Sequence, residues 1–351
     1  MIDAFYPDPI GISIDLEINI GINYAHKKSF GLKKVIVWTR RDIYIFVIIA
    51  AVPTVIYETF HFQWLALPWL PMAIIGTAVA FIIGFQNNAT YNRLWEARMI
   101  YGAIVNSSRT WGMMVKTYIT NKHAQQLLSD SERKAVRRKF IYRHIAWLTA
   151  LRHQLRQPRE WETMDRNYNI EYEKFFTVPE HQISLEDDIA LYLSVIDKEY
   201  ILSKQNRAAH IISVQAEELK ELFNRGLIDN FRHIELQRVL SDLYEHQGKC
   251  ERIKNFPYPR QYATLNLYFV WLFVILLPYG MIPEFEKLGH HITWLTIPFC
   301  VLVSWIFRTV DKIGESSENP FQAGANDIPI TSLSRTIEID LREMLDETEL
   351  P

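Results

Sequence analysis

The sequence predicts an all-α integral membrane protein with four transmembrane helices and a large cytosolic helical domain. The mean hydropathy of −0.06 and net charge of −2 average two different kinds of sequence. One kind is a set of stretches without Lys, Arg, Asp or Glu, each long enough to cross a hydrocarbon layer of about 30 Å as a helix. The other is a long charged region with apolar residues three and four positions apart and no sustained strand-like alternation. The uncharged stretches are residues 64–85, 261–283 and 288–307.

The first membrane helix follows an N-terminal arm, residues 1–30. This arm lacks the basic segment, apolar core and cleavage site of a secretory signal peptide, so we expect it to be retained. Residues 43–57 are shorter than the other spans but strongly apolar, and they begin after Arg40 and Arg41, which suit a membrane interface. We expect them to form a fourth span, and we place the first transmembrane helix pair in residues 31–86.

The second membrane helix should begin near Trp69, because Pro68 and Pro71 suit a first helical turn better than a helix interior. Within residues 81–98 its apolar part passes into a charged part without a proline or a pair of glycines. The sequence therefore predicts a helix that leaves the bilayer and continues into the cytosol.

One face of this helix is a candidate ion pathway. At 100° per residue, six positions share a narrow stripe that is apolar at membrane depth and carries amides beyond it. Around an axis, the Phe81 and Phe85 rings would form a hydrophobic constriction, and Asn88 and Asn92 would replace ion hydration beside it. Alternatively, the rings face lipid or neighbouring helices, as apolar residues in membranes usually do. The six positions are Thr77, Phe81, Gly84, Phe85, Asn88 and Asn92.

The charged part of the same helix contains Arg93, Glu96 and Arg98. We expect these residues to form structural ion pairs within or between helices, and Arg93 and Glu96 have the i, i+3 spacing of a pair on one helix.

The cytosolic helical domain covers residues 87–258. Pro158 and Pro179, with the polar stretch 165–169 between them, predict loops between its helices.

The second transmembrane helix pair occupies residues 259–309, and residues 310–351 form a cytosolic C-terminal tail. Residues 333–345 have the spacing of a short amphipathic helix, which we expect to pack on a neighbouring subunit. Basic residues cluster before the first span, and the number of spans is even, so both termini should be cytoplasmic. Cys250 and Cys300 lie in different regions, which argues against a disulfide and for a reducing compartment.

The sequence contains no pattern that favours an enzyme. The eleven histidines lack metal-ligand spacing, and there is no Gly-rich phosphate loop, nucleophile elbow or intramembrane carboxylate pair. We therefore expect no catalytic site, no cofactor and no nucleic-acid partner. A secondary transporter would show broken helices in repeated halves. A non-conducting membrane scaffold or regulatory protein stays open, because a large helical cytosolic domain also suits such a protein.

Residues 84–98, GFQNNATYNRLWEAR, resemble the signature of the bestrophin family, in particular its bacterial branch. In that branch a Gly-Phe-x-Asn step is followed by Tyr-x-Arg-x-Trp-Glu-Ala-Arg. Two further segments are similar to the family: residues 250–253 with 257–262 ahead of the third span, and residues 318–321 with 326–329 after the fourth. The order of motifs and spans agrees with the family over most of the chain.

The resemblance implies a homopentamer in a lipid bilayer, the inner (plasma) membrane of a bacterium, with one axial pore. The family's neck residues correspond to Thr77, Phe81 and Phe85, the stripe positions found above. The family has apolar residues at all three positions, so Thr77 is a departure. The lower aperture of the family corresponds to Tyr258, before Pro259, where an aliphatic residue is usual.

The permeant ions implied by the resemblance are small and monovalent. Eukaryotic members are mainly anion channels, whereas characterised bacterial relatives favour monovalent cations. The likeness to the bacterial branch therefore favours cations slightly, with a chloride or other anion-selective channel as the alternative.

Animal relatives hold a calcium ion between an acidic cluster after the fourth span and backbone of the N-terminal arm. Asn319 and Asp327 fall at matching positions, but Ser316 and Gly324 stand where other ligands would be. Because calcium takes six to eight oxygen ligands, we expect no tight calcium site here, and no other metal site. The Asn319-Pro320 step instead predicts a turn that docks the tail on the cytosolic domain.

Overall fold

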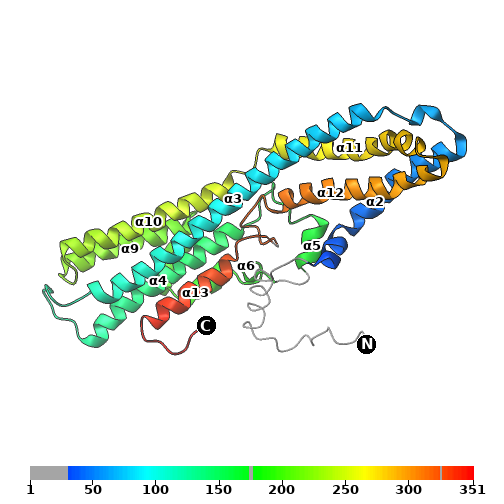
Figure 1. Cartoon of the computed structure of the whole chain (residues 1–351). Coiled ribbons are helices and arrows are strands. Elements are labelled where there is room, and N and C mark those ends of the chain that lie inside the picture. The colour runs from blue at the N-terminus through cyan, green and yellow to red at the C-terminus, as the bar shows by residue number, and fades with distance from the viewer. Residues whose placement is uncertain (1–30, 174–176, 325) are drawn as a thin grey trace, which may run out of the picture.

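The computed structural model describes residues 31–173, 177–324 and 326–351, and every regular element within them is helical (Figure 1). The predicted N-terminal arm lies outside the described residues. In chain order the elements are α2 (Leu32–Phe60), the 3-10 helix η1 (Gln63–Leu65), α3 (Trp69–Tyr118), α4 (Asp130–Arg156), α5 (Asn167–Glu173), α6 (Pro179–Gln182), α7 (Leu185–Ala190), α8 (Val195–Leu202), α9 (Arg207–Asn224), α10 (Asn230–Asn255), α11 (Arg260–Glu286), the 3-10 helix η2 (His290–Leu295), α12 (Thr296–Ser316) and α13 (Ile330–Glu343).

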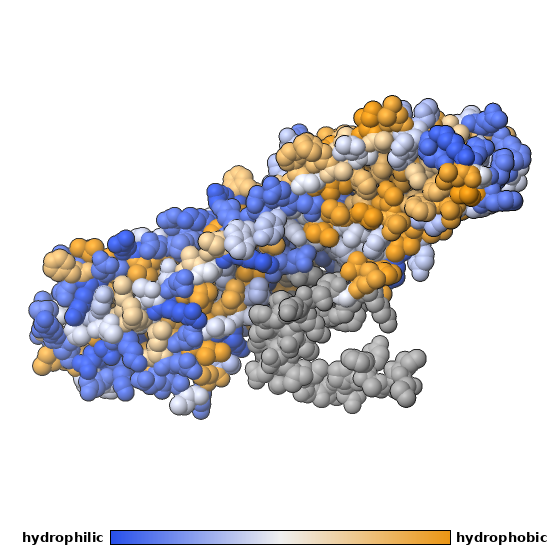
Figure 2. Space-filling view, in the orientation of Figure 1, coloured by the Kyte–Doolittle hydropathy of each residue, from blue (hydrophilic) through white to orange (hydrophobic). Residues whose placement is uncertain are grey.

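The molecule is elongated and has two chemically distinct ends (Figure 1). One end groups α2, α11, α12 and the first half of α3, and hydrophobic side chains gather over it; hydrophilic ones dominate the other end (Figure 2). Four helical stretches at the first end are long and apolar enough to cross a membrane, as the sequence predicts. They are Val35–Phe60, Gln63–Tyr118, Arg260–Glu286 and His290–Ser316.

The first span is longer than the predicted residues 43–57. Its helix continues back through Arg40 and Arg41, whose guanidinium nitrogens lie 2.9 and 3.0 Å from the carboxylate of Glu171 in α5. These ion pairs attach the base of α2 to the hydrophilic part of the chain.

The helices of the membrane-type end pack around a small core that includes Phe46, Val79 and Cys300. Gly76 of α3 lies against Phe273 of α11, and a Cβ atom at Gly76 would come within 2.8 Å of the phenyl ring. The missing side chain therefore lets α3 and α11 approach closely, as small residues do between membrane helices.

Helix α3 is continuous over 50 residues. It begins at Trp69, directly after Pro68, with Pro71 in its first turn, and it ends at Tyr118. The prediction of one helix that passes from the apolar end into the hydrophilic end is confirmed.

The hydrophilic end is a helical bundle, as predicted. A capping box formed by Ser129 and Glu132 begins α4, and the central part of α4 is buried against α3, α9 and α10. Its core contains Trp111 of α3 and Trp147 of α4, both fully buried. The indole N–H of Trp147 donates a hydrogen bond to Gln247 of α10 at 2.9 Å, whereas the buried indole N–H of Trp111 finds no partner among the described residues.

The predicted loops are only partly correct. Pro158 lies in a loop after α4, but Pro179 is the first residue of α6, where its missing N–H costs nothing. The stretch 165–169 is not loop throughout, because Asn167 already begins α5.

The tail helix, α13, confirms the predicted amphipathic helix. It packs on α3 and α4 of its own chain, and its predicted contact with a neighbouring subunit stays a prediction. Its buried face includes Leu341, which lies over Gly112 of α3, where a Cβ atom would come within 2.4 Å of the Leu341 side chain. Arg109 of α3 pairs with Asp340 of α13 at 2.7 Å. The tail is thus part of the single-chain fold.

Candidate functional site

The predicted stripe on α3 is an exposed face of the single chain. All six of its residues are exposed, including Phe81 at 66% and Phe85 at 59%, whereas Val79 and Ile83 face the other helices. The hydroxyl of Thr77 donates a hydrogen bond to the carbonyl oxygen of Ala73 at 2.8 Å, so its hydrogen is satisfied within the helix. The three predicted neck positions therefore occupy a side of α3 that no other helix in the described part of the chain covers.

The amides Asn88 and Asn92 continue this exposed face beyond the phenyl rings. Asn87, although adjacent, points elsewhere: its amide group donates to the carbonyl oxygens of Ile83 and of Val310 in α12, at 2.9 and 3.2 Å. These asparagines therefore have different roles. Asn87 joins α3 to α12, whereas Asn88 and Asn92 are exposed in the described structure.

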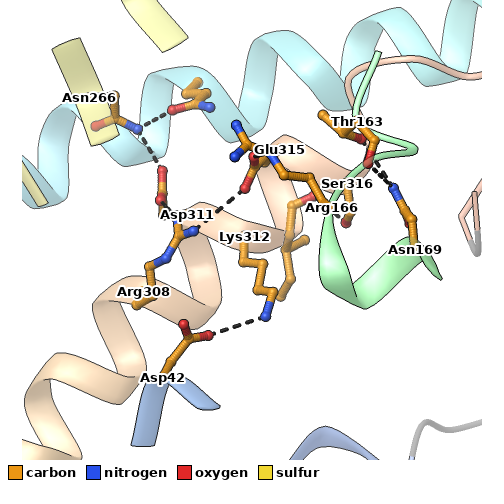
Figure 3. A network of polar contacts seen from close by, with 12 residues as sticks. Asp42, Thr163, Arg166, Asn169, Asn266, Arg308, Asp311, Lys312, Glu315 and Ser316 are labelled. Carbon is orange, nitrogen blue, oxygen red and sulfur yellow. Dashed lines mark hydrogen bonds and ion pairs between the residues drawn. The ribbon is translucent and has the colours of Figure 1, made fainter. Parts of the chain in front are cut away.

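Behind the exposed face, a buried polar network joins three membrane-type helices (Figure 3). The amide of Asn266 in α11 donates to Gln86 of α3 and to Asp311 of α12, the latter at 3.0 Å. Arg308 pairs with Asp311 on the other side. Because Gln86 directly follows Phe85, this network fixes the rotation of α3 at the level of the phenyl rings.

A second group of polar contacts in Figure 3 ties α12 to its neighbours. Lys312 pairs with Asp42 of α2 at 3.1 Å, and its ammonium group lies over the Trp38 ring at 4.8 Å from the centroid. Glu315 pairs with Arg166, just before α5, at 3.2 Å. These charges lie at the junction of the apolar and hydrophilic ends and neutralise one another there.

The predicted lower aperture residue, Tyr258, lies just before α11 and is partly buried beside Tyr262. Burial and the nearby Glu318 carboxyl raise the pKa of Tyr258, so its hydroxyl stays neutral and able to donate a hydrogen bond. Burial also raises the pKa of Glu318, to about 7, against the opposing effect of Arg260 and Arg93. Because Glu318 influences the pKa of Tyr258 and is itself influenced by Arg260, the tail segment after α12 lies near the start of α11.

The calcium-related positions are buried within the fold. Within the described ranges, the side-chain amide nitrogen of Asn319 has no hydrogen-bond partner. One carboxylate oxygen of Asp327 accepts the Ala323 N–H at 2.6 Å, and the other has no partner in the same ranges. Burial raises the pKa of Asp327 to about 7, although Arg156 at 3.9 Å opposes this.

No group of three or more His, Cys, Asp or Glu side chains in the described part of the chain is placed to hold a metal ion. The backbone of the N-terminal arm, which helps to hold the calcium ion in the animal relatives, lies outside the described residues. The predicted docking turn is confirmed, since Phe321 is buried and its carbonyl oxygen accepts a hydrogen bond from Arg156 at 2.9 Å.

Of the expected ion pairs, an interhelical one is confirmed for Glu96, whereas the i, i+3 contact between Arg93 and Glu96 is not formed. Arg93 instead donates to the carbonyl oxygen of Ile253 in α10, and Glu96 pairs with Arg252 of the same helix. Since α10 packs along α3, these side chains find partners across the interface rather than along their own helix.

Sequence reasoning missed the network behind the stripe. A signal was present, because Asn266 is an amide within an otherwise apolar span, and polar residues at membrane depth usually bond across helices. Asp311 carried no such signal, since it lies just outside the uncharged stretch.

Comparison with known proteins identifies the family. The sequence pattern of the family described as "Bacterial/Fungal Bestrophin protein" matches residues 32–343. The chain belongs to this bestrophin family. It is therefore an integral membrane protein and not an enzyme, in agreement with its four membrane-type helices.

Two curated relatives of this bestrophin are bacterial. "Voltage-dependent anion channel-forming protein YneE" of Escherichia coli (strain K12) is 31% identical over 282 residues, which cover 80% of this chain and 78% of the relative. "Voltage-dependent anion channel-forming protein RSc3414" of Ralstonia nicotianae is 28% identical over 296 residues, 83% of each chain. The crystal structure of a bacterial bestrophin homologue from Klebsiella pneumoniae has the same fold, with a TM-score of 0.71, 22% identity, and coverage of 88% of this chain and 98% of that one.

Proposed function

We propose that this bestrophin assembles into a homopentameric channel that passes small monovalent anions through an axial pore lined by α3. The observation that carries the proposal is the exposed face of α3, with Thr77, Phe81 and Phe85 at membrane depth and Asn88 and Asn92 beyond them. If this face of α3 met lipid, the amides of Asn88 and Asn92 would have no polar partner there. Copies arranged around an axis would instead place the two asparagines of each chain along a water-filled path.

The names of the curated relatives support anions rather than the cations favoured by the likeness to the bacterial branch. The chemistry of the proposed lining agrees with this choice. None of its residues carries a carboxylate, the edges of phenyl rings are electropositive, and asparagine amides donate hydrogen bonds. At the proposed lower aperture, the Tyr258 hydroxyl is a further donor, and Arg260 follows two residues later.

The proposed neck would act as a hydrophobic constriction. Rings of Phe81 and Phe85 around an axis would exclude water when narrow, and Asn88 and Asn92 would replace part of the ion's hydration directly below. We further propose that the channel lies in the inner (plasma) membrane of a bacterium, with both termini in the cytoplasm. The even number of membrane-type helices supports this topology.

The test is reconstitution of the purified protein in a planar bilayer, with reversal potentials measured across a KCl gradient. We expect a potential displaced toward the chloride equilibrium potential. Phe81→Ala combined with Phe85→Ala should raise conductance, whereas the control Phe269→Ala with Leu272→Ala, on exposed apolar positions of α11, should not.

Each part of the proposal fails separately. No current from well-folded protein would contradict the channel and favour a scaffold. A potential of the opposite sign would restore the cation reading. Equal conductance of the neck variant and the native chain would remove the stripe from the pore. Native mass measurement in a mild detergent tests the five-chain assembly.

A further inference from the structure

A cavity of about 710 Å³ lies in the hydrophilic end of the molecule, away from the exposed face of α3. It is formed by the end of α4, the short helices α6 and α7, and the beginning of α9. Its size is that of pockets that hold small-molecule ligands. Most of its lining is polar, with several glutamines and few apolar side chains, so an apolar ligand would displace water from these polar groups without replacing its hydrogen bonds.

Arginines dominate the charge of this cavity. Arg156, Arg159 and Arg207 line it, whereas Glu180 is the one acidic residue among the described residues that line it. The Glu180 carboxylate is already paired with Arg152, at 3.1 Å, and it also accepts a hydrogen bond from Thr331. Because Glu180 is engaged by Arg152 and Thr331, it does not neutralise the positive charge of the three arginines that line the cavity.

Two of the three arginines are available to a ligand. Among the described residues no carboxylate lies within 4.0 Å of the Arg159 or Arg207 guanidinium, and both side chains are partly exposed at the cavity wall. Arg156 is fixed in place instead, since it donates to the carbonyl oxygen of Phe321 at 2.9 Å. Its side chain is only 4% exposed.

The nearby carboxylate of Glu251 does not occupy these arginines. It accepts hydrogen bonds from the amides of Gln154, Asn206 and Gln247, at 2.9, 3.0 and 2.7 Å. Asn206 also caps α9 by accepting the Ala209 N–H at 3.1 Å. The beginning of α9, with Arg207 as its first residue, is thus held rigidly at the cavity wall.

We propose that this cavity binds a small multiply charged oxyanion, a compound with phosphate or carboxylate groups, through Arg159 and Arg207. Planar guanidinium groups hold such oxyanions with two parallel hydrogen bonds, and the Arg159 and Arg207 guanidinium groups have no carboxylate partner among the described residues. The positive end of α9 adds to the attraction. Arg156, which is held in the cavity wall by the Phe321 carbonyl oxygen, adds its positive charge to the site.

Titration calorimetry on the full chain, purified in an uncharged detergent, tests the site with two probes, inorganic pyrophosphate and citrate. Salt at about 0.15 M suppresses nonspecific attraction between exposed charges. We expect saturable binding of at least one probe and a higher Tm in its presence. The two titrations assign the ligand to the phosphate or to the polycarboxylate class.

Three variants decide the outcome. Arg207→Gln should weaken binding by about tenfold or more, because a charge-assisted hydrogen bond contributes about 1.5–3 kcal/mol. Arg159→Gln should do the same, and Arg238→Gln, on an exposed arginine of α10 outside the cavity, should have no effect. Arg207 and Arg159 make no side-chain hydrogen bond that the fold needs, so the variants should keep the unliganded Tm of the native chain.

The proposal is overturned if neither probe binds saturably, or if Arg207→Gln and Arg159→Gln bind as tightly as the native chain. Both results are independent of ion conduction. A silent bilayer would therefore remove the proposed channel and leave this site intact, and absent binding would leave the channel intact.

Discussion

The rings of Phe81 and Phe85 lie edge to face, with centroids 4.5 Å apart and planes at 88°. This is the favoured geometry for an aromatic pair, because the electropositive edge of one ring meets the electronegative face of the other. The pair holds two large apolar side chains in one orientation on an otherwise uncovered face of α3. Two phenyl rings that only faced lipid would not need a fixed orientation relative to each other.

The outer end of the proposed neck should depend on the Thr77 hydroxyl. Its lone pairs can meet water although its hydrogen is bonded to Ala73, so Thr77→Val, of nearly equal size, should dry the constriction and lower single-channel conductance several-fold. Thr59→Val, on an exposed residue near the end of α2, is the control and should conduct as the native chain does. Unchanged or higher conductance in Thr77→Val would argue against a neck at this level.

The network behind the neck should contribute to stability. Asn266→Leu removes the amide that bonds Gln86 and Asp311 and leaves both buried without that partner, a loss of about 1–3 kcal/mol. The variant should melt at a lower temperature in detergent. Thr264→Val, exposed on the same helix, should melt with the native chain. Equal Tm values for all three proteins would show that the network is not needed to hold the helices together.

Stability should depend on the protonation of Asp327. Its pKa is raised by burial to about 7 in the folded chain, against about 3.8 for an ordinary aspartate. Between these values the folded chain retains a proton that the unfolded chain releases, so this contribution is present at low pH and lost as pH rises through about 7.

Asp327→Asn should therefore flatten the loss of Tm between pH 5 and pH 8, because the amide keeps an acceptor for the Ala323 N–H but never ionises. Relative to the native chain, the variant should gain stability as pH rises. Asp242→Asn, on an exposed residue of α10, should follow the native profile. Parallel profiles for Asp327→Asn and the native chain would contradict the buried, protonated carboxyl.

The docking of α13 should depend on the absence of a side chain at Gly112. Gly112→Val would bring carbon atoms into the space of Leu341 and Met344 and push α13 away from α3. We expect faster proteolytic cleavage within the tail. Gly102→Val makes the same substitution on the same helix, with the same change in helix propensity, but its new Cβ atom has nothing within 4 Å. It should therefore leave the tail protected. Equal cleavage of both variants would place the attachment of α13 elsewhere.

Periodicity and length were sufficient to predict the helical class, the four membrane-type helices and the exposed stripe. These features depend on local rules, namely 100° per residue along α3 and the length needed to cross a bilayer. The start of α3 at Trp69 was predictable for a similar reason, since the prolines at its beginning restrict the backbone locally.

The polar partners were not predictable in the same way. Arg93 and Glu96 suit each other by spacing, but α10 offers both of them alternatives that lie more than 150 residues away in the chain. The Asn266 bridge likewise joins residues from three helices, and the cavity between α4 and α9 exists only after the bundle has formed. Such contacts follow from tertiary packing, on which a single sequence carries little direct information.

The unbroken course of α3 also has a mechanical consequence. Its 50 residues, at 1.5 Å each, make a rod about 75 Å long, with no proline beyond the first turn to act as a hinge. The end of α3 that contacts α4, α10 and α13 is therefore joined to Phe81 and Phe85 by one uninterrupted helix. The Gln86–Asn266–Asp311 contact anchors that helix directly beside the phenyl rings.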